Sequence, residues 1–171
     1  NFLVHSILFL AFLLVFEEVK HFKFWYVFLV LLAASFHSTA YIFLVFFLSF
    51  ITDEIIDLKK AVFFTLILVL ISIFSFEVLI QLLGTSYIDK VDFYSTGGGI
   101  TTSFYAHFLI VLLTYLYVKV ILEHGEEVSS YQQRIFTIFV NVNILSLTFL
   151  SVYYHIPYFS RALRFLFAFN R

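Results

Sequence analysis

The chain has 171 residues, of which 63% are hydrophobic and 12% are charged, and its mean hydropathy is +1.04. This composition excludes a water-soluble domain and predicts a protein that resides in a lipid bilayer. The net charge of −1 excludes the basic face that binding to nucleic acid requires, and the absence of cysteine excludes disulfides and thiolate metal sites.

Apolar stretches follow one another along the chain and predict membrane-spanning helices, because crossing the hydrocarbon takes about 20 apolar residues and lipid offers the backbone no hydrogen-bond partner. They cover residues 2–16, 24–51, 61–83, 103–122 and 135–154, with the start of another at 160–171. The first is too short to cross alone and the last is cut off, so we expect a fragment of a longer protein. The predicted fold is all-α, a polytopic membrane helical bundle that forms a single transmembrane domain over residues 1–171.

The second stretch is too long for one straight helix, because 28 residues at 1.5 Å each make about 42 Å. Small and hydroxylated residues surround His37, so we predict that this helix is broken at residues 35–38. The break allows either a re-entrant hairpin or an interfacial helix that feeds a shorter span. The positive-inside rule favours re-entry. Six basic residues then share the cytoplasmic side: Lys20, Lys23, Lys59, Lys60, Lys119 and Arg134.

Several polar side chains lie at membrane depth under this topology. His37 and Glu77 fall in the outer half of the membrane, where a polar side chain should face protein or water rather than lipid. A histidine near a helix end is usually an interfacial residue bonded to the backbone, and we interpret His5, His107 and His155 in this way. His37 differs from them because it lies at the predicted break, so a catalytic role and a structural one remain open.

The stretch FHSTAYIFL resembles the FHxSAL signature of the EpsG family, bacterial membrane proteins similar to the Wzy polymerases of exopolysaccharide and O-antigen synthesis. His37 stands at the position of the family's histidine, and Ala40 matches the signature. Thr39 stands where serine is usual, and Tyr41 replaces leucine. A second stretch, YFSRALRFL, is similar to the family's arginine motif, SRLxxYF, through its serine, Arg161 and leucine.

The resemblance implies a metal-independent glycosyltransferase of the bacterial cytoplasmic (inner) membrane, without a cofactor. Its partners would be membrane lipids, a glycan linked to undecaprenyl pyrophosphate and a chain-length regulator. Arg161 and Arg164, three residues apart on one helix face, would stabilise the charge that develops on the pyrophosphate leaving group. A histidine or a carboxylate such as Glu77 would take the proton of the acceptor hydroxyl, and His37 is the preferred base. The implied substrate-binding residues are Ser38, Glu77, Tyr94 and Arg164.

Three other functions fit the same residues. A transporter or flippase of lipid-linked sugars would also place a polar residue at a broken helix near the midplane. A membrane O-acyltransferase would also depend on a histidine. A structural subunit would use its polar residues for packing alone.

Overall fold

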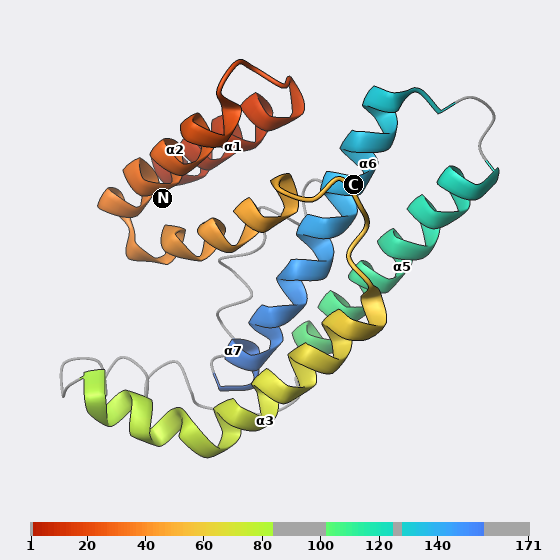
Figure 1. Cartoon of the computed structure of the whole chain (residues 1–171). Coiled ribbons are helices and arrows are strands. Elements are labelled where there is room, and N and C mark those ends of the chain that lie inside the picture. Colours follow the sequence, from red (N-terminus) through yellow and green to blue (C-terminus); the bar gives the residue numbers. More distant parts are fainter. Residues whose placement is uncertain (1, 84–101, 125–127, 156–171) are drawn as a thin grey trace. The chain divides into compact units, whose positions relative to one another are not determined.

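The computed structural model describes residues 2–83, 102–124 and 128–155, and these residues form helices and their connections without a strand (Figure 1). The all-α prediction is confirmed. The helices in chain order are α1 (Phe2–Phe16), α2 (Phe22–Phe36), η1 (Ser38–Phe50), α3 (Leu58–Leu83), α5 (Thr102–His124), α6 (Ser130–Ser146), η2 (Leu147–Phe149) and α7 (Leu150–His155).

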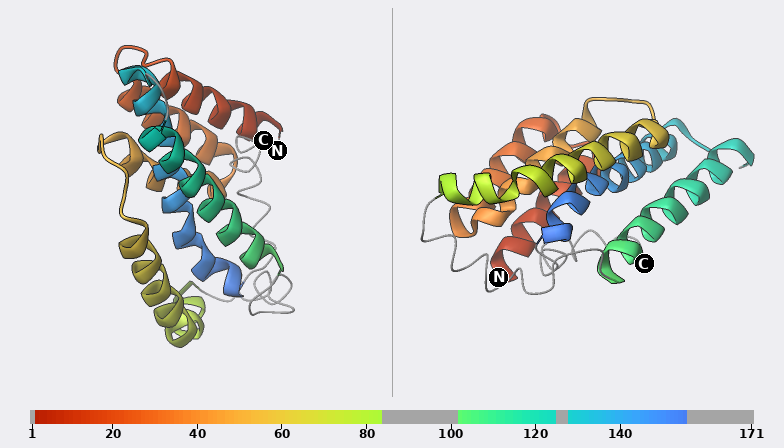
Figure 2. Two further views of the ribbon diagram at one scale, coloured as in Figure 1. Left: turned by 90° about the vertical axis from the view of Figure 1, so that its right-hand side faces the viewer. Right: turned by 90° about the horizontal axis from the view of Figure 1, so that it is seen from below.

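The helices belong to two compact units. The first unit contains α1, α2, η1 and α6 up to Leu145, and the second contains α3, α5, η2 and α7. Within the first unit α1 packs against α2, and within the second α3 packs against α7 (Figure 2). The single transmembrane domain over residues 1–171 stays a prediction.

The turn between α1 and α2 forms without glycine or proline, since neither occurs before residue 84. Glu18 and His21 adopt positive φ angles of 48° and 62° instead, in the left-handed region that glycine or asparagine usually occupies. The start of α6 contacts this turn at two points. The Nε of Arg134 lies 2.9 Å from Oε1 of Glu18, and the hydroxyl of Tyr131 donates to a carbonyl at the end of α1.

The helix break predicted at residues 35–38 is confirmed. Helix α2 ends at Phe36, His37 has an extended backbone with φ −155° and ψ 114°, and η1 begins at Ser38. The two helices then pack along each other, and the buried hydroxyl of Tyr26 donates to the carbonyl of Phe43 over 2.7 Å. The stretch is therefore a helical hairpin with His37 at its tip.

Helix η1 is a 3-10 helix of 13 residues, whereas most 3-10 helices are a single turn. Four of the five side chains that are described as buried recur every third residue, at Ala40, Phe43, Phe46 and Ser49, and the fifth is the terminal Phe50. A 3-10 helix has three residues per turn, so these four side chains lie above one another on one face. This spacing lets the helix bury a continuous stripe of side chains, and two of them, Phe43 and Phe46, contact the ring of Phe12 on α1.

The core of the first unit is a cluster of aromatic rings around Phe12. The ring of Phe12 lies 5.5 Å from Tyr26, 6.4 Å from Phe43 and 6.2 Å from Phe50, each time edge to face. Phe12 is only 2% exposed, and Tyr26 is fully buried. Part of the chain's high phenylalanine content therefore builds a protein core.

Two stretches of the described chain are long and apolar enough to cross a membrane, Phe104–His124 and Ser130–Val152. Only 17% of the first is buried, which is unlike the core helix of a soluble protein. Its exposed side chains include Leu113 at 56% and Val120 at 56%. Large apolar side chains without a protein cover are expected on a helix that faces lipid.

Candidate functional site

His37 is the predicted site residue that the structure describes most fully. Its backbone N–H donates to the carbonyl of Ala33 over 3.0 Å, and its own carbonyl accepts from Ala40 over 2.9 Å. Both alanines are buried, at 0% and 1% exposure, and small side chains let two membrane helices approach closely. His37 itself is half-buried. The hairpin thus holds the backbone of His37 at a defined point on its tip.

The depth of this tip follows from the length of α2. Fifteen residues at 1.5 Å each reach about 22 Å, less than the roughly 30 Å of membrane hydrocarbon. The lysines that flank the start of α2 are exposed, as expected for a helix end at the membrane surface. In the predicted topology, a helix of this length that starts at one surface would place His37 inside the membrane, and this depth stays a prediction.

The remaining predicted site residues are only partly covered by the structure. Ser38 is the first residue of η1, and Glu77 belongs to α3, but the positions of their side chains are not described. Tyr94, Arg161 and Arg164 lie outside the described residues. The convergence of these side chains on one site stays a prediction.

The interpretation of His107 as an interfacial, backbone-bonded residue is wrong. His107 is 1% exposed, and its Nε2 lies 2.6 Å from Oγ of Ser146, which is 2% exposed. The bond joins α5 to the last residue of α6. His155 also pairs with a serine, because its Nε2 lies 3.3 Å from Oγ of Ser72 on α3. Both histidines link helices within the second unit, a known role of polar side chains in membranes.

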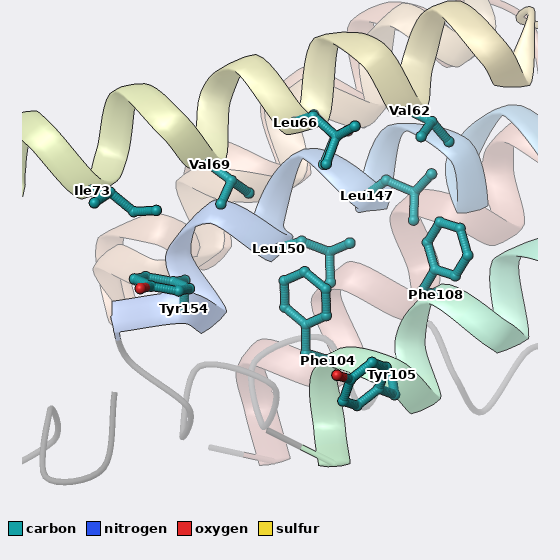
Figure 3. A pocket seen from close by; sticks show the side chains of 11 residues that line it. Val62, Leu66, Val69, Ile73, Phe104, Tyr105, Phe108, Leu147, Leu150 and Tyr154 are labelled. Carbon is teal, nitrogen blue, oxygen red and sulfur yellow. The ribbon is translucent and has the colours of Figure 1, made fainter. Parts of the chain in front are cut away.

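A cavity of about 460 Å³ lies between α3, α5 and the η2–α7 segment of the second unit (Figure 3). Helix α3 lines it with Val62, Leu66, Val69 and Ile73, and α5 lines it with phenylalanine and tyrosine rings. Sequence reasoning missed this cavity. The spacing of four, three and four residues along α3 was the available signal, since it places all four side chains on one helix face.

The described residues contain no group of three histidine, aspartate or glutamate side chains that could hold a metal ion together. Asp53, Glu54 and Asp57 are close in sequence, yet Asp57 caps α3 instead, accepting from the backbone N–H of Lys59 over 2.8 Å. The metal independence of the reaction stays a prediction, because much of the expected site lies outside the described residues.

No curated protein and no solved structure matches the chain. A family model does match it, that of the EpsG family, over residues 1–170. The match covers essentially the whole chain and includes both stretches that resemble the family's signatures. Together with the two long apolar helical stretches and the histidine at the helix break, it shows that this chain is a membrane protein of the EpsG family.

Proposed function

We propose that this protein is a glycosyltransferase that polymerises sugar repeat units carried on undecaprenyl pyrophosphate, for an extracellular polysaccharide or O-antigen. It acts as a multi-pass protein of the bacterial inner membrane, on the outer face, beside a chain-length regulator. One observation carries the proposal: the chain matches the EpsG family over residues 1–170, and its signature histidine, His37, lies at the tip of a helical hairpin.

The proposed reaction transfers a sugar from one lipid carrier to the glycan of another. A hydroxyl of the acceptor attacks the anomeric carbon of the donor, and a new glycosidic C–O bond forms as the bond to pyrophosphate breaks. The bonding electron pair leaves with the lipid pyrophosphate, and the hydroxyl proton passes to a base. Arg161 and Arg164 stabilise the leaving group, since guanidinium groups bind phosphate oxygens with paired hydrogen bonds.

The position of His37 suits the role of the base. An imidazole accepts and returns a proton near neutral pH, and a general base must be held within hydrogen-bond reach of the hydroxyl. Hydrogen bonds on both sides of His37 fix its backbone between α2 and η1. His37 is half-buried, so part of the residue is exposed at the hairpin tip.

The test compares variants of the full-length protein in cells that lack the native copy. His37→Ala and Arg161→Ala should each abolish polymer while the membranes contain normal amounts of protein. His124→Ala serves as the matched control, because His124 is exposed at the end of α5, and it should leave polymer length unchanged. Polymer of normal length from both site variants would refute the catalytic assignment.

A second assay separates polymerisation from the two competing activities. Purified full-length protein in proteoliposomes receives a lipid-linked repeat unit alone, and the products are separated by size. Longer glycans on the lipid carrier support polymerisation. Movement of the intact unit between leaflets without joining would indicate a flippase, and a requirement for an acyl donor would indicate an O-acyltransferase.

A further inference from the structure

The outward side of α2 presents a stripe of large apolar side chains. Residues three and four positions apart share one helix face, and this face is exposed from the first turn of α2 to the last. We call it the α2 outer face, and its apolar members, with their exposed fractions, are Phe24 (64%), Trp25 (42%), Phe28 (46%), Leu31 (46%), Leu32 (38%) and Phe36 (58%). The other side of α2 is buried and packs against α1 and η1. A stripe of this size marks a binding surface for an apolar occupant.

The residue types along the α2 outer face follow the layers of one bilayer leaflet. Aromatic rings gather at its start, where Trp25 lies edge to face with Phe24 at 5.5 Å and with Phe28 at 5.9 Å. The two leucines of the face follow about 10 Å further along the helix axis. Tryptophan concentrates at the border between headgroups and hydrocarbon, whereas leucine prefers the hydrocarbon. The order places the headgroups at the start of α2, where Lys20 and Lys23 are exposed.

The side chains of this face fit lipid better than a second helix. Membrane helices approach each other closely where small residues line the contact, and the buried side of α2 has such residues in Ala33 and Ala34. On the α2 outer face the small exposed residue is Ser35, which lies near the hairpin tip. Its hydroxyl donates to the carbonyl of Leu32 over 2.7 Å, so Ser35 is satisfied within its own helix. The face therefore suits acyl chains.

The charges at the aromatic end leave one positive charge in excess, with histidine counted as neutral. The acidic residues of the α1–α2 turn are Glu17 and Glu18, and the first turn of α2 has none. Glu18 is paired with Arg134 of α6 over 2.9 Å. Lys20 and Lys23 form no ion pair with another described residue, and one carboxylate remains to offset them. One excess positive charge complements the single negative charge of phosphatidylglycerol, whereas a zwitterionic lipid carries no net charge to match it.

We infer that the start of α2 binds an anionic phospholipid, phosphatidylglycerol, with its phosphate at Lys20 and Lys23 and its acyl chains along the α2 outer face. The turn between α1 and α2 then lies at the membrane surface. This lipid site is independent of the proposed polymerase activity, so the failure of either leaves the other standing.

Trp25 reports on its own surroundings, because it is the only tryptophan of the chain. Full-length protein, with any tryptophan outside these 171 residues replaced by phenylalanine, is placed in nanodiscs that contain brominated lipids, which quench indole fluorescence on contact. Bromine near the ester end of the acyl chains should quench Trp25 more strongly than bromine near the methyl end. An indole that neither lipid quenches would face protein or water, and the inference would fail.

The choice of headgroup is tested in equal mixtures of phosphatidylglycerol and phosphatidylcholine, in which one lipid or the other is brominated. One excess charge near the surface favours the anionic lipid by about fivefold, and unselective neighbours of Trp25 dilute this to at least about twofold in the measured quenching. The double variant Lys20→Gln/Lys23→Gln should abolish the preference. Lys59→Gln/Lys60→Gln is the matched control, because these two lysines are also exposed but begin α3 of the other unit. Equal loss in both double variants would indicate a general attraction to the membrane and refute the site.

Two further measurements keep the inference testable if the lysine variant fails to fold by size-exclusion chromatography. Glu17→Gln removes the remaining carboxylate at an exposed position, so it should raise the preference for phosphatidylglycerol. High salt should lower the preference of the wild-type protein, because it screens exposed charges. A preference that neither Glu17→Gln nor salt changes would not depend on charge, and the assignment of the phosphate to the two lysines would be wrong.

Discussion

Replacing Phe12 by alanine should destabilise the first unit by about 2–3 kcal/mol. In a water-soluble core the same change costs about 3–5 kcal/mol, but part of that is the transfer of the ring out of water. In a membrane this part is absent, because lipid is as apolar as the core. Three edge-to-face contacts, with Tyr26, Phe43 and Phe50, remain to be lost. Each is worth about 0.5–1.5 kcal/mol, and contacts that share one ring add less than their sum.

The assay titrates SDS into mixed micelles of the full-length protein and follows the loss of helical circular dichroism. Phe9→Ala is the matched control, since Phe9 lies three residues earlier on α1 and is 46% exposed. Lipid or detergent fills the space that the Phe9 ring leaves, so Phe9→Ala should lower the free energy of unfolding by less than about 1 kcal/mol. An equal loss of unfolding free energy in the two variants would show that the ring cluster does not stabilise the first unit.

Three further experiments test other contacts by the same titration. The double-mutant cycle of His107→Phe and Ser146→Ala should give a coupling energy of about 1 kcal/mol, as for other hydrogen bonds between membrane helices, and a value near zero would contradict the bond. Thr65→Val should be neutral or stabilise by up to about 1 kcal/mol, because the buried hydroxyl has no partner among the described residues; a clear loss would reveal one. Arg134→Met should cost less than about 1 kcal/mol, since its pair with Glu18 is partly exposed and screened, and a larger loss would make this pair a main support of the turn.

The sequence predicted those features that depend on local composition. The length of the first apolar stretch predicted a helix at residues 2–16, where α1 is found. The small residues around His37 predicted the break that follows Phe36. The helix expected at residues 103–122 is found as α5, two residues longer at its C-terminal end. Each of these depends only on residues that are close in the chain.

Contacts between distant residues could not be predicted in this way. Ser146 is 39 residues from His107, and Ser72 is 83 residues from His155. A hydroxyl among many in apolar sequence gives no signal of which imidazole it will meet. The other members of the predicted site are equally far from His37 in the chain, so motifs in a single sequence can suggest these residues but cannot give their geometry.

The stripe on η1 makes this segment sensitive to changes in length. Deleting three residues from a helix with three residues per turn returns every later side chain to its former direction, whereas deleting four turns them by about 120°. An α-helix shows the opposite preference, because four residues complete slightly more than one of its turns. Shortening the gene by nine nucleotides within this segment should therefore be tolerated better than shortening it by twelve.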